Sequence, residues 1–102
     1  MHEQIFKNLE ALLEKAGIPV SVAAMLFKTS RPTIYSWCAG NPPNQELLRF
    51  NALRIIKAIE SAVAAKALPY EGYDHTAMLR GYDVAEVRNK IALILRGHLN
   101  GG

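Results

Sequence analysis

The sequence is poor in cysteine and in long apolar runs. Cys38 is its single cysteine, and the longest unbroken apolar run is residues 22–27. One cysteine cannot form a disulfide within the chain, and it leaves no pair of thiols for a zinc or redox motif. A bilayer span needs about 20 apolar residues, and the start of the chain lacks the pattern of a secretory signal. We therefore expect a soluble, cytoplasmic protein without a membrane partner.

The sequence also lacks any grouping of residues typical of an enzyme or a metal site. Its three histidines, His2, His75 and His98, lie in different segments, and no pair has the helical spacing of metal ligands. The serines lack the context of a nucleophile elbow. We expect no metal, no cofactor, no small-molecule ligand and no enzymatic activity.

The spacing of apolar residues predicts helices and no strand. With 102 residues, half of them apolar, the chain has room for a single domain, residues 1–102. Apolar periodicity predicts helices over residues 2–16, 20–27, 30–39 and 45–68, and a fifth from residue 84 to just before Gly97. Breakers separate them, namely Gly17, Pro19, residues 40–44 and Pro69. The expected fold class is all-α, with a long fourth helix and a C-terminal helix. Residues 69–82 are expected to form a loop packed by its own tyrosines, with a wing-like hairpin as the lesser alternative.

The most informative segment is residues 23–37, which is typical of two short helices joined by a tight turn. Thr29 or Ser30 can cap the second helix, and Pro32 fits its first turn, where an N–H would have no partner within the helix. Ile34 and Trp37 share one face and can anchor that helix in the core. A tryptophan so placed is interpreted as an anchor in preference to a base-stacking residue.

The other face of that second helix carries Arg31, Thr33, Tyr35 and Ser36, all able to form hydrogen bonds. The run Ser30-Arg31-Pro32-Thr33-Ile34-Tyr35-Ser36-Trp37, followed by Gly40, resembles the helix-turn-helix of lambda-repressor-like and Cro-like regulators of phages and bacteria. The resemblance covers roughly residues 2–60 and implies a compact helix-turn-helix core there, with residues 61–98 as a C-terminal extension. Two positions depart from the family pattern, because Lys28 stands where glycine is usual and Thr29 where an apolar residue is usual. A lysine with positive φ costs about 1 kcal/mol, so the turn is the point to check.

The positive charge is concentrated around this segment. Of the 12 basic residues, six lie between residues 28 and 66, where only Glu46 and Glu60 are acidic. Such a distribution favours binding to phosphates, and a solvated helix face is the alternative interpretation.

Together these features predict a sequence-specific regulator of transcription that binds double-stranded DNA, a repressor of phage or prophage type in a bacterial cell. The second helix would lie in the major groove, and Tyr35 is favoured as a DNA contact over a merely exposed tyrosine. The residues expected to bind DNA are Lys28, Ser30, Arg31, Pro32, Thr33, Tyr35, Ser36 and Arg49. The alternative function is a protein-interaction module on the same fold, such as an antitoxin or an antirepressor.

One such helix covers only a few base pairs, so a homodimer on a palindromic site is expected. The expected dimerisation element is the apolar stripe of the C-terminal helix, formed by Val84, Val87, Ile91, Ile94 and Leu95. The alternative is that this helix folds back on the long helix of its own chain.

Overall fold

Six helices and no strand make up the part of the chain that the computed structural model describes, which is residues 2–69 and 84–99, with side chains for residues 4–69 and 88–99. The helices are α1 (His2–Lys7), α2 (Leu9–Ala16), α3 (Val20–Leu26), α4 (Arg31–Cys38), α5 (Glu46–Ala64) and α7 (Val84–Leu99). The all-helical class expected from the sequence is thereby confirmed. The radius of gyration is 12.9 Å, which fits a compact arrangement of these helices.

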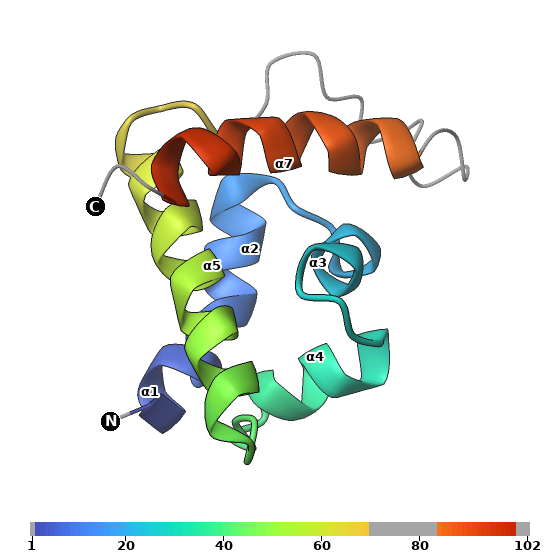
Figure 1. The fold of residues 1–102 in the computed structure, drawn as a ribbon, viewed down its shortest axis with the longest axis vertical. Coiled ribbons are helices and arrows are strands. Elements are labelled where there is room, and N and C mark those ends of the chain that lie inside the picture. Colours follow the sequence, from blue (N-terminus) through green and yellow to red (C-terminus); the bar gives the residue numbers. More distant parts are fainter. Residues whose placement is uncertain (1, 70–83, 100–102) are drawn as a thin grey trace.

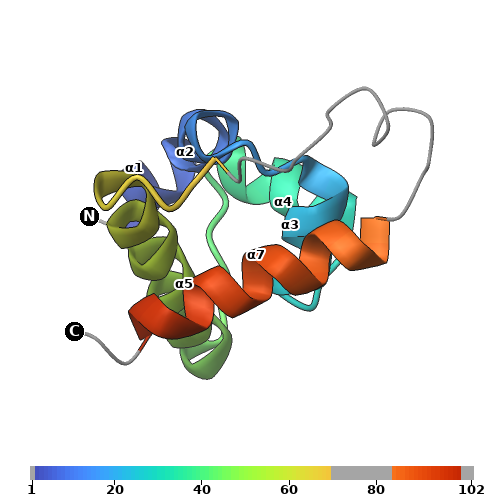
Figure 2. The same cartoon turned by 90° about the horizontal axis from the view of Figure 1, so that it is seen from above.

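The helices surround one apolar core. In Figure 1, α5 and α2 run beside each other, while α3 and α4 stand on the other side of the molecule. Helix α7 packs on both α5 and α3, and Figure 2 shows it crossing from one to the other. Every helix with described side chains contributes, and the largest fully buried side chains are Phe6, Leu9, Val22, Ile34, Ile56, Ile59, Leu68 and Ile91.

Four of the helices end in the same way. At the C-termini of α2, α3, α4 and α5 a residue with positive φ lies one or two positions after the helix. The N–H of the residue that follows it donates to a carbonyl oxygen five residues back, as in a Schellman motif. After α3, for example, Lys28 N–H donates to Met25 O at 3.2 Å and Thr29 N–H donates to Ala24 O at 2.8 Å. The four residues in this left-handed conformation are Gly17, Lys28, Gly40 and Lys66. Lys28, which stands where the resembled family usually has glycine, adopts a positive φ of 55°.

Three helix boundaries differ by more than one residue from those predicted. The helix expected over residues 2–16 is divided at Asn8, although Asn8 N–H still donates to Gln4 O at 3.0 Å. The long helix ends at Ala64 instead of residue 68, because Lys66 adopts a left-handed conformation. The last helix continues through Gly97 to Leu99. The loop predicted for residues 69–82 lies outside the described residues from residue 70 onward.

Helix α7 is packed inside its own chain. Ile91 and Leu95 are 1% and 4% exposed, and Ile94 is half-buried against the same core. Ser61 Oγ on α5 lies 3.0 Å from His98 Nδ1 on α7, which adds a polar contact to this packing. The prediction that Ile91 and Leu95 belong to a dimer interface is therefore corrected, because their side chains are buried within the subunit itself. The side chains of Val84 and Val87 lie outside the described part.

Candidate nucleic-acid interface

Helix α4 is fixed to the core by two side chains on one face. Ile34 is fully buried and Trp37 is 3% exposed. The Trp37 ring meets Phe6 of α1 and Phe27 at the end of α3 edge-to-face, with ring centroids 5.5 Å and 5.6 Å apart. Such aromatic pairs add about 0.5–1.5 kcal/mol beyond the area they bury. The interpretation of Trp37 as a core anchor is confirmed, and the opposite face of α4 is held in a fixed orientation.

The start of α4 is capped as the sequence indicates. Ser30 is the N-cap residue, and the backbone N–H of Thr33 donates to Ser30 Oγ at 3.3 Å. The two hydroxyls are 2.9 Å apart, so Ser30 and Thr33 are held together at the N-terminus of the helix. Pro32 lies in the first turn, where its missing N–H costs no hydrogen bond. This local geometry presents the hydroxyl groups of Ser30 and Thr33 at one end of α4.

The outer face of α4 is open to solvent. Arg31, Tyr35 and Ser36 are exposed, and the Tyr35 side chain retains 57% of its accessible surface. Thr33 is half-buried and Pro32 is exposed. The expected division of α4 into an anchored face and a polar outer face is therefore present in the structure.

Two hollows flank this face and show what lies beside it. Thr33 and Ser36 line one hollow together with Asn41, Asn44 and Leu48. Tyr35 borders another hollow on the other side of α4, with Pro19 and Val20 at the start of α3. The loop after α4 therefore stands next to its outer face, and it places two amide side chains there.

The basic residues lie on two elements around α4. Lys28 is exposed at the turn between α3 and α4, and it lines a hollow shared with Asn51 and Arg54 of α5. Arg49, predicted as a DNA contact, is half-buried on α5, whereas Arg54 and Lys57 are exposed. The structure thus brings Lys28 close to Arg54, a residue that was not among the predicted site residues.

Asn41 and Asn44 were also missed by the sequence analysis. Both are exposed and flank the rigid pair Pro42 and Pro43. The signal in the sequence was this pairing of asparagines with prolines directly after the second helix, because an asparagine on a stiff loop can offer a fixed donor and acceptor.

Cys38 at the end of α4 has no feature of a reactive thiol. Burial raises the pKa of its thiol, and the nearby carboxylate of Glu10 raises it further. A thiol with a raised pKa stays protonated at neutral pH and is a poor nucleophile. Among the residues described, no group of three histidine, cysteine or acidic side chains is placed to hold a metal ion.

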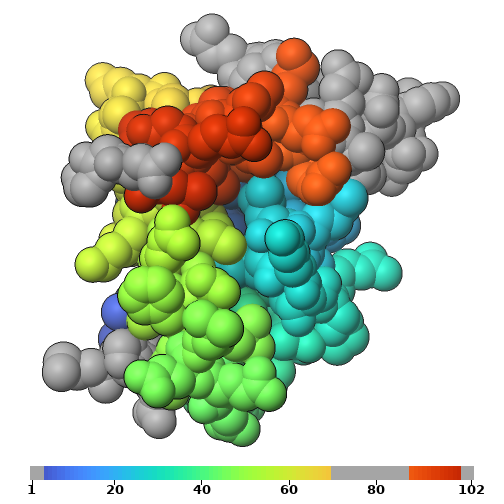
Figure 3. All heavy atoms as spheres, viewed as in Figure 1, coloured from blue at the N-terminus to red at the C-terminus, as the bar shows by residue number. Residues whose placement is uncertain are grey.

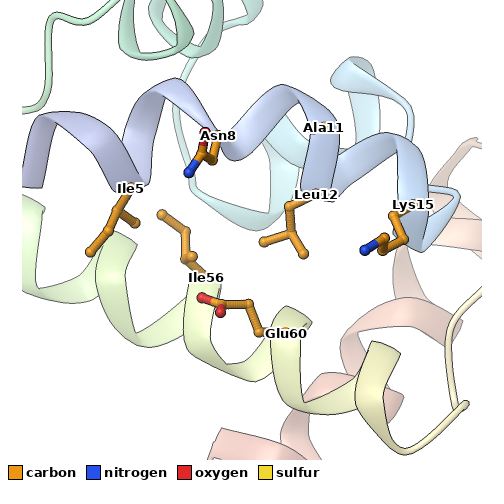
Figure 4. A pocket seen from close by; sticks show the side chains of 7 residues that line it. All are labelled: Ile5, Asn8, Ala11, Leu12, Lys15, Ile56 and Glu60. Carbon is orange, nitrogen blue, oxygen red and sulfur yellow. The ribbon is translucent and has the colours of Figure 1, made fainter.

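A further hollow of about 300 Å³ lies away from α3 and α4, between α5 and the helices α1 and α2 (Figure 4). Ile5 and Leu12 point into it from one side and Ile56 from the other, while Lys15 and Glu60 stand at its rim.

The described helices include none that is both long and apolar enough to cross a bilayer.

Comparisons of the chain with protein-family models, with curated proteins and with solved structures found no match. The functional interpretation therefore depends on the geometry of α3, α4 and the basic residues around them.

Proposed function

We propose that this chain binds double-stranded DNA through α3 and α4, which act as a helix-turn-helix, and that it represses transcription by occupying a promoter. The observation that carries the proposal is the two-sided character of α4, with Ile34 and Trp37 buried while Arg31, Tyr35 and Ser36 are exposed. A helix anchored on one face and polar on the other can enter the major groove and read base edges.

The surroundings of α4 support the same function. Lys28 is exposed at the turn between α3 and α4, where its ammonium group can contact a phosphate. Arg31 begins α4 and can reach a guanine edge or a phosphate. The resemblance of residues 30–37 to lambda-repressor-like and Cro-like regulators adds a further reason, and it implies the regulatory role. We place the protein in the cytoplasm of a bacterial cell, on its DNA.

The first test measures binding to a random-sequence DNA duplex. Fluorescence anisotropy gives the affinity at each of a series of salt concentrations. Each phosphate contact contributes about 0.9 to the slope of log affinity against log salt. We expect the paired change Lys28→Gln and Arg31→Gln to weaken binding to every sequence and to lower that slope by about two units. The matched control is Lys15→Gln, which removes an exposed positive charge from α2.

Two results would count against the proposal. One is a wild-type protein that does not bind the duplex at low salt, which would favour the alternative of a protein-interaction module on this fold. The other concerns the slope of log affinity against log salt. It is a Lys15→Gln variant that lowers this slope, for each charge removed, as much as the paired change does. Once selection from random sequences yields a preferred site, Arg31→Ala is expected to cost about 1–3 kcal/mol of specific binding, if Arg31 bonds a guanine edge.

A further inference from the structure

The outward face of the first half of α5 carries an apolar patch. Leu47 and Phe50 are 72% and 58% exposed, and they lie three residues apart, so they are neighbours on the same face of the helix. The start of α5, light green in Figure 3, stands out on the face of the molecule shown there. A single exposed apolar residue is ordinary, whereas two large ones side by side on a helix form a patch that a partner can cover.

Charged residues of opposite sign lie at the two ends of this patch. Glu46, Phe50 and Arg54 are spaced by four residues, so they follow one another along the same face of α5. All three are exposed. In chain order, the face therefore has an acidic end, an apolar centre and a basic end.

This order makes the face complementary to itself. If two copies of α5 pack antiparallel with Phe50 at the centre, Glu46 of each copy lies across from Arg54 of the other, and two-fold symmetry forms this pair twice. Parallel packing would instead place like charges side by side. We propose that a second copy of this chain covers the Glu46–Arg54 face of α5, forming an antiparallel two-fold dimer.

The inference rests on the proposed function, because a DNA reader of this size needs two copies for specificity. It moves the dimer interface away from α7, whose Ile91 and Leu95 are buried in their own chain. The face on α5 begins directly after the loop that follows α4. No residue of this face belongs to α4, whose exposed side chains Arg31 and Tyr35 are the proposed DNA contacts.

The test is a charge reversal with rescue, read by sedimentation equilibrium. Glu46→Arg alone and Arg54→Glu alone each turn both attractive pairs into repulsive ones, and we expect each to raise the dimer dissociation constant about tenfold or more. The double variant, Glu46→Arg with Arg54→Glu, restores opposite charges at both contacts without changing the net charge. Its dissociation constant is expected to return to within about threefold of the wild-type value. Phe50→Ser is expected to give monomers with unchanged helical content, because this side chain is exposed in the subunit.

Leu93→Glu on α7 is the matched control, since Leu93 is 63% exposed on another helix and its change should leave the dimer intact. A wild-type monomer at all concentrations measured, or a double variant no better than the single ones, would overturn the dimer. DNA binding is measured separately with the random duplex. A dimer that ignores DNA contradicts the proposed function alone, and a monomer that binds DNA contradicts the dimer alone.

Discussion

Lys28 and Lys66 occupy backbone positions that usually belong to glycine. Their φ angles are 55° and 62°, and each forms the same hydrogen bonds after its helix as Gly17 and Gly40 do. A side chain in this region costs about 1–2 kcal/mol. A positive charge near a helix C-terminus offsets part of that cost through the helix dipole. At Lys28 the remaining cost is a loss of stability. The same residue places a cation at the turn between α3 and α4, where we propose that it contacts a phosphate.

That exchange can be measured at Lys28. Lys28→Gly is expected to raise the free energy of unfolding by about 1 kcal/mol, because glycine adopts positive φ without a steric penalty. It should also weaken binding to random-sequence DNA, since the charge is lost. Lys28→Ala is the control, as it removes the same charge and keeps the penalty. Urea unfolding of the two variants gives the comparison, and a Lys28→Gly protein no more stable than Lys28→Ala would refute the prediction.

At the scale of one element, α4 is the helix that the sequence specified best. Its cap, its proline in the first turn and its two anchors act within a few residues of one another, so their effect is visible in the sequence. Ser30 is the cap, and Trp37 lies in the core. The same local reasoning located the anchored and outer faces of the candidate site.

A pair of substitutions at Ser30 separates the stability of α4 from its proposed contact with DNA. Ser30→Ala removes the side-chain acceptor of the Thr33 N–H, and we expect a loss of about 1 kcal/mol in the free energy of unfolding. Ser30→Asp keeps a capping oxygen, so its stability should stay near that of the wild type. Its negative charge would face phosphates, and DNA affinity should fall further than in Ser30→Ala. Equal affinities in the two variants would place Ser30 away from the DNA.

The end of α7 depends on contacts that a sequence does not display. Gly97 was expected to stop the last helix, yet α7 continues, with Leu99 packed against the core and His98 beside Ser61. Distant contacts here outweigh the low helix propensity of one glycine, which is about 1 kcal/mol. Asn41 and Asn44 were missed as site residues for a related reason, because only the folded loop brings them beside α4.

At the scale of the whole molecule, the sequence could not decide what α7 packs against. An apolar stripe has the same pattern whether it meets a second copy or its own chain. The choice depends on how much apolar surface α3 and α5 leave uncovered, and that is a property of their arrangement in space. In the structure they leave enough to bury Ile91 almost completely.

The position of α7 leads to a prediction about stability. Ile91→Glu would bury a carboxylate at a site that is 1% exposed, and we expect the subunit to unfold instead of merely losing a partner. Leu93→Glu, two residues away and 63% exposed, should change the free energy of unfolding by no more than about 0.5 kcal/mol. Circular dichroism during thermal unfolding compares the two. A well-folded Ile91→Glu monomer would show that α7 is not part of the subunit core.

The packing of α7 on α3 also sets the order in which the molecule can be completed during its synthesis. Helices α3 and α4 are made early, whereas α7 is the last of the described helices to leave the ribosome. Until it does, the side of α3 that α7 covers remains in water, and the core that positions the outer face of α4 is unfinished. Each newly made chain must therefore release residues 84–99 from the ribosome before it can present the fully packed surface that we propose for DNA.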